Sequence, residues 1–142
     1  MIRAAEESDA PALAELMTQL GYRTTAEEMR ERLRAIFRHR DFTTLVAVEE
    51  NEVCGMIGLS ASVGYEHNDR TGRIMALVVH ERIRSRGIGR ALLAAAEDYF
   101  ARVKIARVVL TSRFARERAH AFYESLGYFR TGLRFMKELP IR

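Results

Sequence analysis

The stretch from Arg84 to Leu93, RSRGIGRALL, places Gly87 and Gly89 among three arginines. An apolar run typical of a strand, GRIMALVV at residues 72–79, precedes it, and a run with helical spacing follows it. Glycines at such a junction let a ligand approach the backbone closely, because no Cβ intervenes. The first amides of a helix lack partners within the helix and lie at the positive end of its dipole. The junction therefore predicts an anion site suited to phosphate oxygens.

Two other phosphate-binding motifs do not fit this stretch. A P-loop needs lysine and then serine or threonine after its last glycine, whereas Arg90 and Ala91 follow Gly89. A dinucleotide-binding fingerprint needs a third small residue where Leu92 stands. The alternative interpretation of the stretch, taken alone, is an ordinary loop with arginines facing solvent.

Composition narrows the class of protein. The chain has 142 residues, 48% of them hydrophobic and 30% charged, which is typical of one globular domain over residues 1–142. The net charge is +4, but the arginines alternate with acids, as in TAEEMRERLRAIFRHRD, which favours a solvated helix face. We therefore expect no nucleic-acid partner. The single cysteine, Cys54, excludes an internal disulfide and predicts a buried small side chain, and we expect no metal site.

The chain shows no membrane or export signal. No apolar run approaches the roughly 18 residues of a membrane span, and the opening MIRAAEESDAPALAEL carries acids where a signal peptide needs an apolar core. We expect a soluble, cytoplasmic protein without a membrane partner.

The hydrophobic spacing before the glycines predicts two helices between strands. Residues 2–5 fit a short strand, and Ser8 or Asp9 fits the cap of a helix that ends at Gly21. Thr24 or Thr25 starts a second helix, and residues 43–65 fit a hairpin that turns at 49–52.

After the glycines, Ile88, Leu92, Ala96 and Phe100 recur every four residues and predict a buried helix stripe. Residues 106–112 fit a strand and 116–127 a helix, and 128–139 is expected to add one or two final strands. The order βααβββαβαβ predicts a mixed α/β domain.

Two motifs of the chain resemble those of a known enzyme family. Residues 84–89 match the acetyl-CoA-binding signature Arg/Gln-x-x-Gly-x-Gly/Ala of the GNAT acetyltransferases, and Leu77 and Val79 match the end of the strand before it. A second motif, Ala-x-x-Phe-Tyr-x-x-x-Gly-Phe/Tyr, is matched by Ala119, Phe122, Tyr123, Gly127 and Tyr128. The resemblance runs from Ile2 to about Leu139, and it is greatest to small bacterial members that acetylate small amines, including aminoalkylphosphonate acetyltransferases.

The resemblance implies an α/β (α+β) GNAT fold. Its mixed, mostly antiparallel, twisted sheet would have six to seven strands with about four helices, and two strands would splay at the acetyl-CoA site. It implies that the co-substrate acetyl-CoA is held by Leu77, Val78, Val79, Arg84, Ser85, Arg86, Gly87, Ile88, Gly89, Arg90, Arg116 and Tyr123. By analogy with the family we also expect a homodimer, and an acceptor groove bordered by residues 20–22.

The resemblance implies that Tyr123 is the catalytic proton donor, which its ordinary pKa of roughly 10 permits at neutral pH. The strand before the glycines lacks the glutamate that family members often use as a base. We name His67 as the base candidate because imidazole commonly acts as a general base near neutral pH. Glu66, Asp69, His80 and Glu81, or a water chain, are the alternatives.

These features predict direct acetyl transfer from acetyl-CoA to a primary amine in a ternary complex. Arg73 is a candidate partner for an anionic acceptor. Two alternatives remain open at this stage: a non-catalytic acyl-CoA sensor, and an acetyltransferase acting on protein N-termini or lysines.

Overall fold

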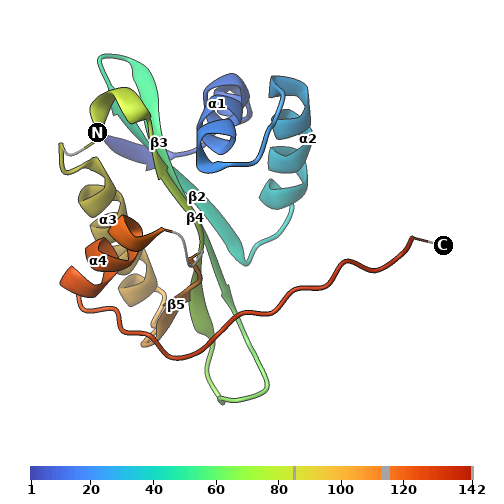
Figure 1. Ribbon diagram of the computed structural model, residues 1–142, viewed down its shortest axis with the longest axis vertical. Helices are drawn as coiled ribbons and strands as arrows, with labels where there is room; N and C mark the ends of the chain where they lie inside the picture. The colour runs from blue at the N-terminus through green and yellow to red at the C-terminus, as the bar shows by residue number, and fades with distance from the viewer. Residues whose placement is uncertain (85, 113–115, 142) are drawn as a thin grey trace. The chain divides into compact units, whose positions relative to one another are not determined.

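The computed structural model describes residues 1–84, 86–112 and 116–141 (Figure 1). The strands are β1 (Ile2–Ala4), β2 (Phe42–Glu49), β3 (Glu52–Ser62), β4 (Thr71–Val79) and β5 (Val108–Leu110). The α-helices are α1 (Ala10–Leu20), α2 (Ala26–Phe37), α3 (Ile88–Arg102) and α4 (Glu117–Ser125), and short 3₁₀ turns occupy Glu7–Asp9 (η1) and Glu81–Ile83 (η2). The chain divides into two compact units, Met1–Leu110 and Thr111–Arg142.

The first unit is built on a five-stranded sheet in the order β1-β2-β3-β4-β5. The pairs from β1 to β4 are antiparallel, whereas β4 and β5 are parallel. The predicted hairpin at residues 49–52 is confirmed, and its turn places Glu50 and Asn51 at φ 51° and 65°. The mixed, mostly antiparallel sheet agrees with the fold class that the sequence indicated.

Helices α1 and α2 lie side by side on one face of this sheet (Figure 1). Their apolar stripes bury Leu13, Leu16, Met29 and Leu33 against the sheet residues Val46, Met56 and Val78. Local sequence sets the bounds of both helices. Gly21, with φ 118°, ends α1, and Thr25 and Glu28 form a reciprocal capping box at the start of α2.

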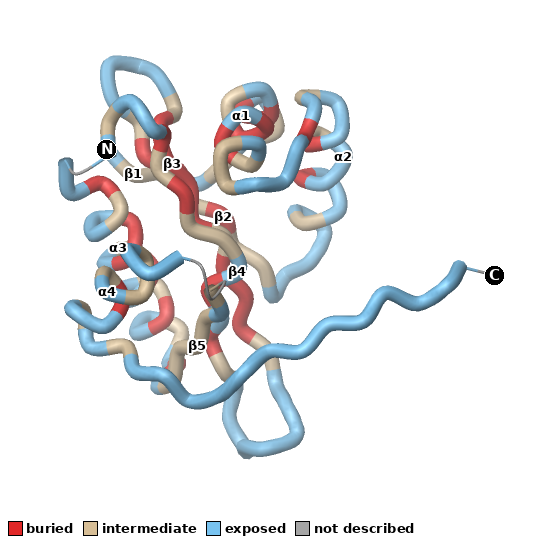
Figure 2. Tube along the Cα trace, viewed as in Figure 1, coloured by how far each residue is buried: buried red, intermediate tan, exposed pale blue. Residues whose placement is uncertain are grey.

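Helix α3 covers the opposite face and contacts β2, β3 and β4. Its predicted stripe is confirmed, since Ile88, Leu92, Ala96 and Phe100 are all buried. Gly72 on β4 permits the close contact, because a Cβ there would lie 2.8 Å from Cε1 of Phe100. Figure 2 shows buried residues along the strands and an exposed loop between β3 and β4.

The second unit contains α4 and the segment that follows it. We expected one or two strands in residues 128–139, and this was wrong: residues 128–141 are in neither helix nor strand, so the described residues hold five strands and not six to seven. Apolar and aromatic residues are typical of strands, but a strand also needs a neighbour to bond with its backbone. The pattern therefore overpredicted the sheet.

The described residues contain neither a membrane-spanning helix nor a cluster of metal-binding side chains. None of their helices is long and apolar enough to cross a membrane. Nor do they bring three or more His, Cys, Asp or Glu side chains together in a group that would hold a metal ion.

An ion pair fixes β1 to the start of α1. Two nitrogens of Arg3 bond the two carboxylate oxygens of Asp9 at 2.8 and 2.9 Å, and the amide of Glu6 donates to Oδ2 of Asp9 at 2.8 Å. Asp9 is only 7% exposed. The bonds from Arg3 hold the pKa of the Asp9 carboxyl below its ordinary value, against the opposing effect of burial.

We expect Asp9→Asn to lower the free energy of unfolding by about 1–3 kcal/mol at neutral pH, because Arg3 loses its charged partner. A lowered native pKa stabilises the fold above the ordinary carboxyl range, near pH 4, and this contribution is lost as the pH falls through the native pKa. The difference between wild type and variant should therefore shrink in urea titrations below about pH 4. Glu7→Gln, which breaks the exposed pair with Arg34, is the control and should have a much smaller effect. A difference that did not change with pH would contradict this role for Asp9.

Candidate functional site

The second half of β4 has a backbone edge that its parallel neighbour does not cover. In the described residues, β5 pairs with β4 only from Gly72 to Ile74, although β4 continues to Val79. On the other side β3 pairs with β4 as far as Val79. β5 ends at Leu110, so the second half of β4 has no strand on this side among the described residues.

A β-bulge lies where the pairing of β4 with β5 ends. Ala76 faces Gly58 and Ile74 faces Leu59, so Met75 has no partner on β3. A bulge bends its strand and increases its twist. The bulge therefore falls directly after the last residue of β4 that pairs with β5, Ile74.

Leu77 and Val79 are the residues whose backbone N–H and C=O groups point away from β3 along this edge. The amide of His80 bonds the carbonyl of Cys54 on β3 at 2.7 Å. Because antiparallel pairs alternate, Val78 and Ala76 also turn their backbone groups toward β3. Leu77 and Val79 then turn theirs toward the edge that β5 leaves unpaired. The carbonyl of Val79 accepts a bond from Arg84 there, and an extended ligand can pair with the other groups.

The glycine loop, residues 80–87, joins this edge to α3. It begins with η2 and ends at Gly87, whose φ of 81° lies in the left-handed region. Gly87 is the N-cap of α3 and has no side chain with which to cap it, while its carbonyl accepts the first helical bond from Ala91. The amides of Ile88, Gly89 and Arg90 are thus the first of the helix, and they lack partners within it.

Positive charge surrounds this helix start. Arg84, Arg86 and Arg90 are exposed, and Nε of Arg84 donates to the carbonyl of Val79 at 3.2 Å. Ser85, also expected to contact the coenzyme, lies outside the described residues. The loop thus brings the amides at the start of α3 and three guanidinium groups into one short stretch of chain, an arrangement suited to a phosphate-bearing ligand.

Tyr123 lies on α4 in the second unit and is buried, with 9% of its surface exposed. Its ring makes edge contacts with Phe122 and Tyr128, at centroid distances of 5.4 and 6.2 Å. Burial raises the pKa of the Tyr123 phenol, and the nearby charge of Arg116 partly opposes this rise. The phenol is therefore protonated at neutral pH, as a proton donor requires.

The base candidates in the loop between β3 and β4 lie at the far end of β4 from the glycine loop. Glu66, His67 and Asp69 are exposed and precede Thr71, whereas the glycine loop follows Val79. Arg107 bonds Asp69 at 2.9 Å and lowers the pKa of its carboxyl, which makes it a weak base. The assignment of His67 as base stays a prediction.

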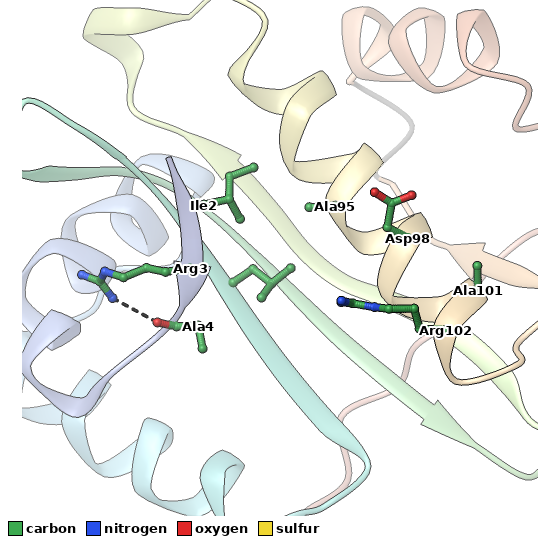
Figure 3. Close-up of a pocket in the computed structure, with 8 residues that line it drawn as sticks. Ile2, Arg3, Ala4, Ala95, Asp98, Ala101 and Arg102 are labelled. Atoms are coloured by element: carbon green, nitrogen blue, oxygen red, sulfur yellow. Dashed lines mark hydrogen bonds between the residues drawn. The ribbon is translucent and has the colours of Figure 1, made fainter.

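One hollow of about 620 Å³ in the first unit lies between β1 and α3 (Figure 3). Asp98 and Arg102 of α3 line it together with Arg3 of β1, and none of the expected site residues does. A second hollow of about 200 Å³ includes Cys54, His80, Arg86 and Ile88 in its lining. The smaller hollow, and not the larger one, therefore adjoins the candidate site.

Two residues that the sequence did not single out contact the glycine loop. Glu15 and Gln19 of α1 reach His80, with closest atoms 2.9 and 3.1 Å apart. Their spacing of four residues places them on one side of the helix, which was the signal available. The spacing could not show that this side faces the loop, because only the packing of α1 on the sheet decides that.

Comparison with known proteins places this geometry in a family. The model of the acetyltransferase (GNAT) family matches residues 10–128. An aminoalkylphosphonate N-acetyltransferase of Salmonella typhimurium is 35% identical over 94 residues, which cover 66% of this chain and 61% of that protein. The match therefore spans less than two thirds of the relative's length.

Solved structures of other proteins share this fold. A GNAT family acetyltransferase of Staphylococcus aureus is 30% identical, with a TM-score of 0.84 and 98% of each chain covered. The aminoglycoside N-acetyltransferase AAC(6')-Iy, solved in complex with CoA, has a TM-score of 0.87 over 99% of this chain and 95% of its own. At 14% identity it shows the fold alone. The chain belongs to the GNAT family of acetyltransferases.

Proposed function

We propose that this chain is an N-acetyltransferase that uses acetyl-CoA and transfers the acetyl group to the primary amine of a small molecule. The observation that carries the proposal is the open edge of β4 that leads into the glycine loop and the uncapped start of α3. We further propose that both units form one catalytic domain, since the family match from residue 10 to 128 includes parts of each.

In this proposal the coenzyme lies along β4 and ends at α3. The diphosphate takes the amides of Gly87 to Arg90 and the charges of Arg84 and Arg86, because the helix start and the guanidinium groups both favour phosphate oxygens. The pantetheine arm pairs with the outward backbone groups of Leu77 and Val79. Arg116, exposed at the N-cap of α4, is a further candidate for a phosphate contact.

The reaction is a direct acyl transfer. The amine nitrogen attacks the thioester carbon, so a C–N bond forms and the C–S bond breaks. A backbone amide of β4 stabilises the charge that develops on the carbonyl oxygen. The phenol of Tyr123 gives its proton to the departing thiolate, and the proton of the amine passes to a base or to water.

Support for a small amine comes from the relative in Salmonella, which is named for aminoalkylphosphonates. Arg73 supplies a fitting charge for such an anionic acceptor. It is exposed on β4, two positions before the bulge residue Met75. We therefore propose aminophosphonates and similar anionic amines as the acceptor class to test first.

The proposal is tested by measuring free-thiol release from acetyl-CoA with amines, aminophosphonates and short peptides, together with thermal unfolding. We expect thiol release with at least one small amine. Acetyl-CoA at about a hundred times its Kd should raise the melting temperature by about 10 °C through mass action. Release only with peptides would contradict the small-amine acceptor. Coenzyme binding without release would favour an acyl-CoA sensor, and no shift at millimolar acetyl-CoA would overturn the proposal.

Gly87→Ala should weaken acetyl-CoA binding, because a Cβ at positive φ costs about 1–2 kcal/mol and displaces the first amides of α3. Nothing lies within 4 Å of the added Cβ, so the strain is in the backbone alone. Gly21→Ala is the matched control, since Gly21 also has a positive φ but ends α1. Both variants should lose stability in urea, and calorimetry should show weaker coenzyme binding only for Gly87→Ala. Equal affinities in the two variants would remove the loop from the coenzyme site.

Tyr123→Phe should lower kcat about a hundredfold or more with little change in coenzyme affinity, because it removes the proton donor and keeps the ring. The ring contacts with Phe122 and Tyr128 remain available, so the fold is retained. Tyr128→Phe, which removes a hydroxyl from the adjacent ring, is the control and should stay near wild-type turnover. An unchanged kcat in Tyr123→Phe would exclude Tyr123 as the acid.

A further inference from the structure

His80 stands at the start of the glycine loop and is one of the few buried polar residues of the first unit, with 7% of its surface exposed. It follows Val79 directly and precedes η2. His80 is therefore buried, and both of its ring nitrogens have hydrogen-bond partners.

One side of the ring fixes the loop. Nδ1 of His80 accepts the amide proton of Arg82 at 3.2 Å, which caps η2. The carbonyl of His80 accepts from the amide of Ile83 at 3.1 Å. The ring and the backbone of His80 thus set the first turn of the loop.

The other side of the ring faces α1. Because Nδ1 accepts a bond, the proton of the neutral ring is on Nε2, and Nε2 donates it to Oε1 of Glu15 at 2.9 Å. Nε2 of Gln19 lies 3.1 Å from the same ring nitrogen but is also a donor, so in this tautomer the two nitrogens make no hydrogen bond. Gln19 holds the loop through its Oε1, which accepts the amide proton of Glu81 at 3.0 Å. Helix α1 therefore holds both His80 and the next residue of the loop.

This helix is a firm support. Leu13 and Leu16 of α1 are fully buried in the core against the sheet. The amides of residues 80–83 all have acceptors: Cys54, Gln19, His80 Nδ1 and the His80 carbonyl. The start of the loop is thus bound to β3 and to α1 before the chain reaches Arg84 and Gly87.

We propose that Glu15, Gln19 and His80 form a loop clasp that positions the glycine loop for the coenzyme's diphosphate, and that His80 is its central positioning residue. The proposal rests on the proposed function for the identity of the ligand. The clasp touches neither the amine nor the thioester; it acts through the backbone of residues 81–83. It also replaces the alternative of His80 as base, because Nδ1, the nitrogen with the lone pair, is already bonded to Arg82.

Three substitutions of His80 test separately its bond to Glu15 and its bond to the Arg82 amide. His80→Asn keeps an acceptor near the place of Nδ1 and loses the reach to α1. His80→Gln keeps the reach toward Glu15 and loses the cap on η2, while His80→Ala loses both. We expect the Kd for CoA, measured by calorimetry, to rise about fivefold for each of the first two and more for the third. At saturating acetyl-CoA, kcat should change less than twofold.

Glu15→Ala tests the clasp without disturbing the core, because the Glu15 side chain is 62% exposed and the change removes the acceptor of the His80 Nε2 proton. It should weaken CoA binding while the melting temperature stays near that of wild type. Glu31→Ala, on the exposed side of α2, is the matched control and should leave the Kd unchanged. If Glu15→Ala and His80→Ala both kept the wild-type Kd for CoA, or if kcat fell and Kd did not, the positioning role would be overturned.

Hydrogen exchange in the protein without coenzyme separates this proposal from the proposed function. The amides of Glu81 and Arg82 should exchange slowly in wild type, and the Arg82 amide should lose its protection in His80→Ala. Fast exchange of both amides in wild type would overturn the clasp, whatever the coenzyme does. Slow exchange in wild type, lost in His80→Ala, in a protein that binds no CoA would refute the proposed function and leave the clasp as a support of the loop.

Discussion

The pairing of β4 with two different neighbours over two different lengths is the constraint on which the site depends. β3 holds β4 along most of its length, while β5 holds it only from Gly72 to Ile74. The bulge at Met75 comes directly after the part of β4 that pairs with both neighbours. Since β3 keeps the second half of β4 rigid, its outer edge can remain open to a ligand without loss of the strand.

The same constraint places the charged part of the site. Val79 ends β4, and the eight residues from 80 to 87 connect it to α3, which packs across the sheet. The packing of Ile88, Leu92 and Phe100 fixes the axis of α3, and with it the direction in which the first helical amides point. The loop clasp fixes the other end of this connection, so both ends of the glycine loop are anchored in the hydrophobic core. An anion site made of backbone amides needs such anchoring, because it has few side chains to orient the ligand.

Local sequence signals were sufficient to predict most of the helices and strands. Gly21 set the end of α1 and Thr25 the start of α2, and the spacing of Ile88, Leu92 and Phe100 gave the face of α3. The glycines at 87 and 89 gave the position of the candidate site, because positive φ and close backbone approach require that residue type. The same kind of signal wrongly predicted strands at 128–139, since the residue types of a segment say nothing about whether a neighbouring strand is present to pair with it.

The sequence by itself therefore determined most of the order of the elements, the position of the glycine loop and the resemblance to the family, because each depends on neighbours within a few positions along the chain. Only the tertiary structure decided that β5 pairs with β4 no further than Ile74, that Met75 is the bulge, and that His80 is bonded to α1. Glu15 and His80 are 65 positions apart, and no local pattern relates them. Such contacts arise when packed faces bring distant polar groups together, and burial then requires those groups to find partners.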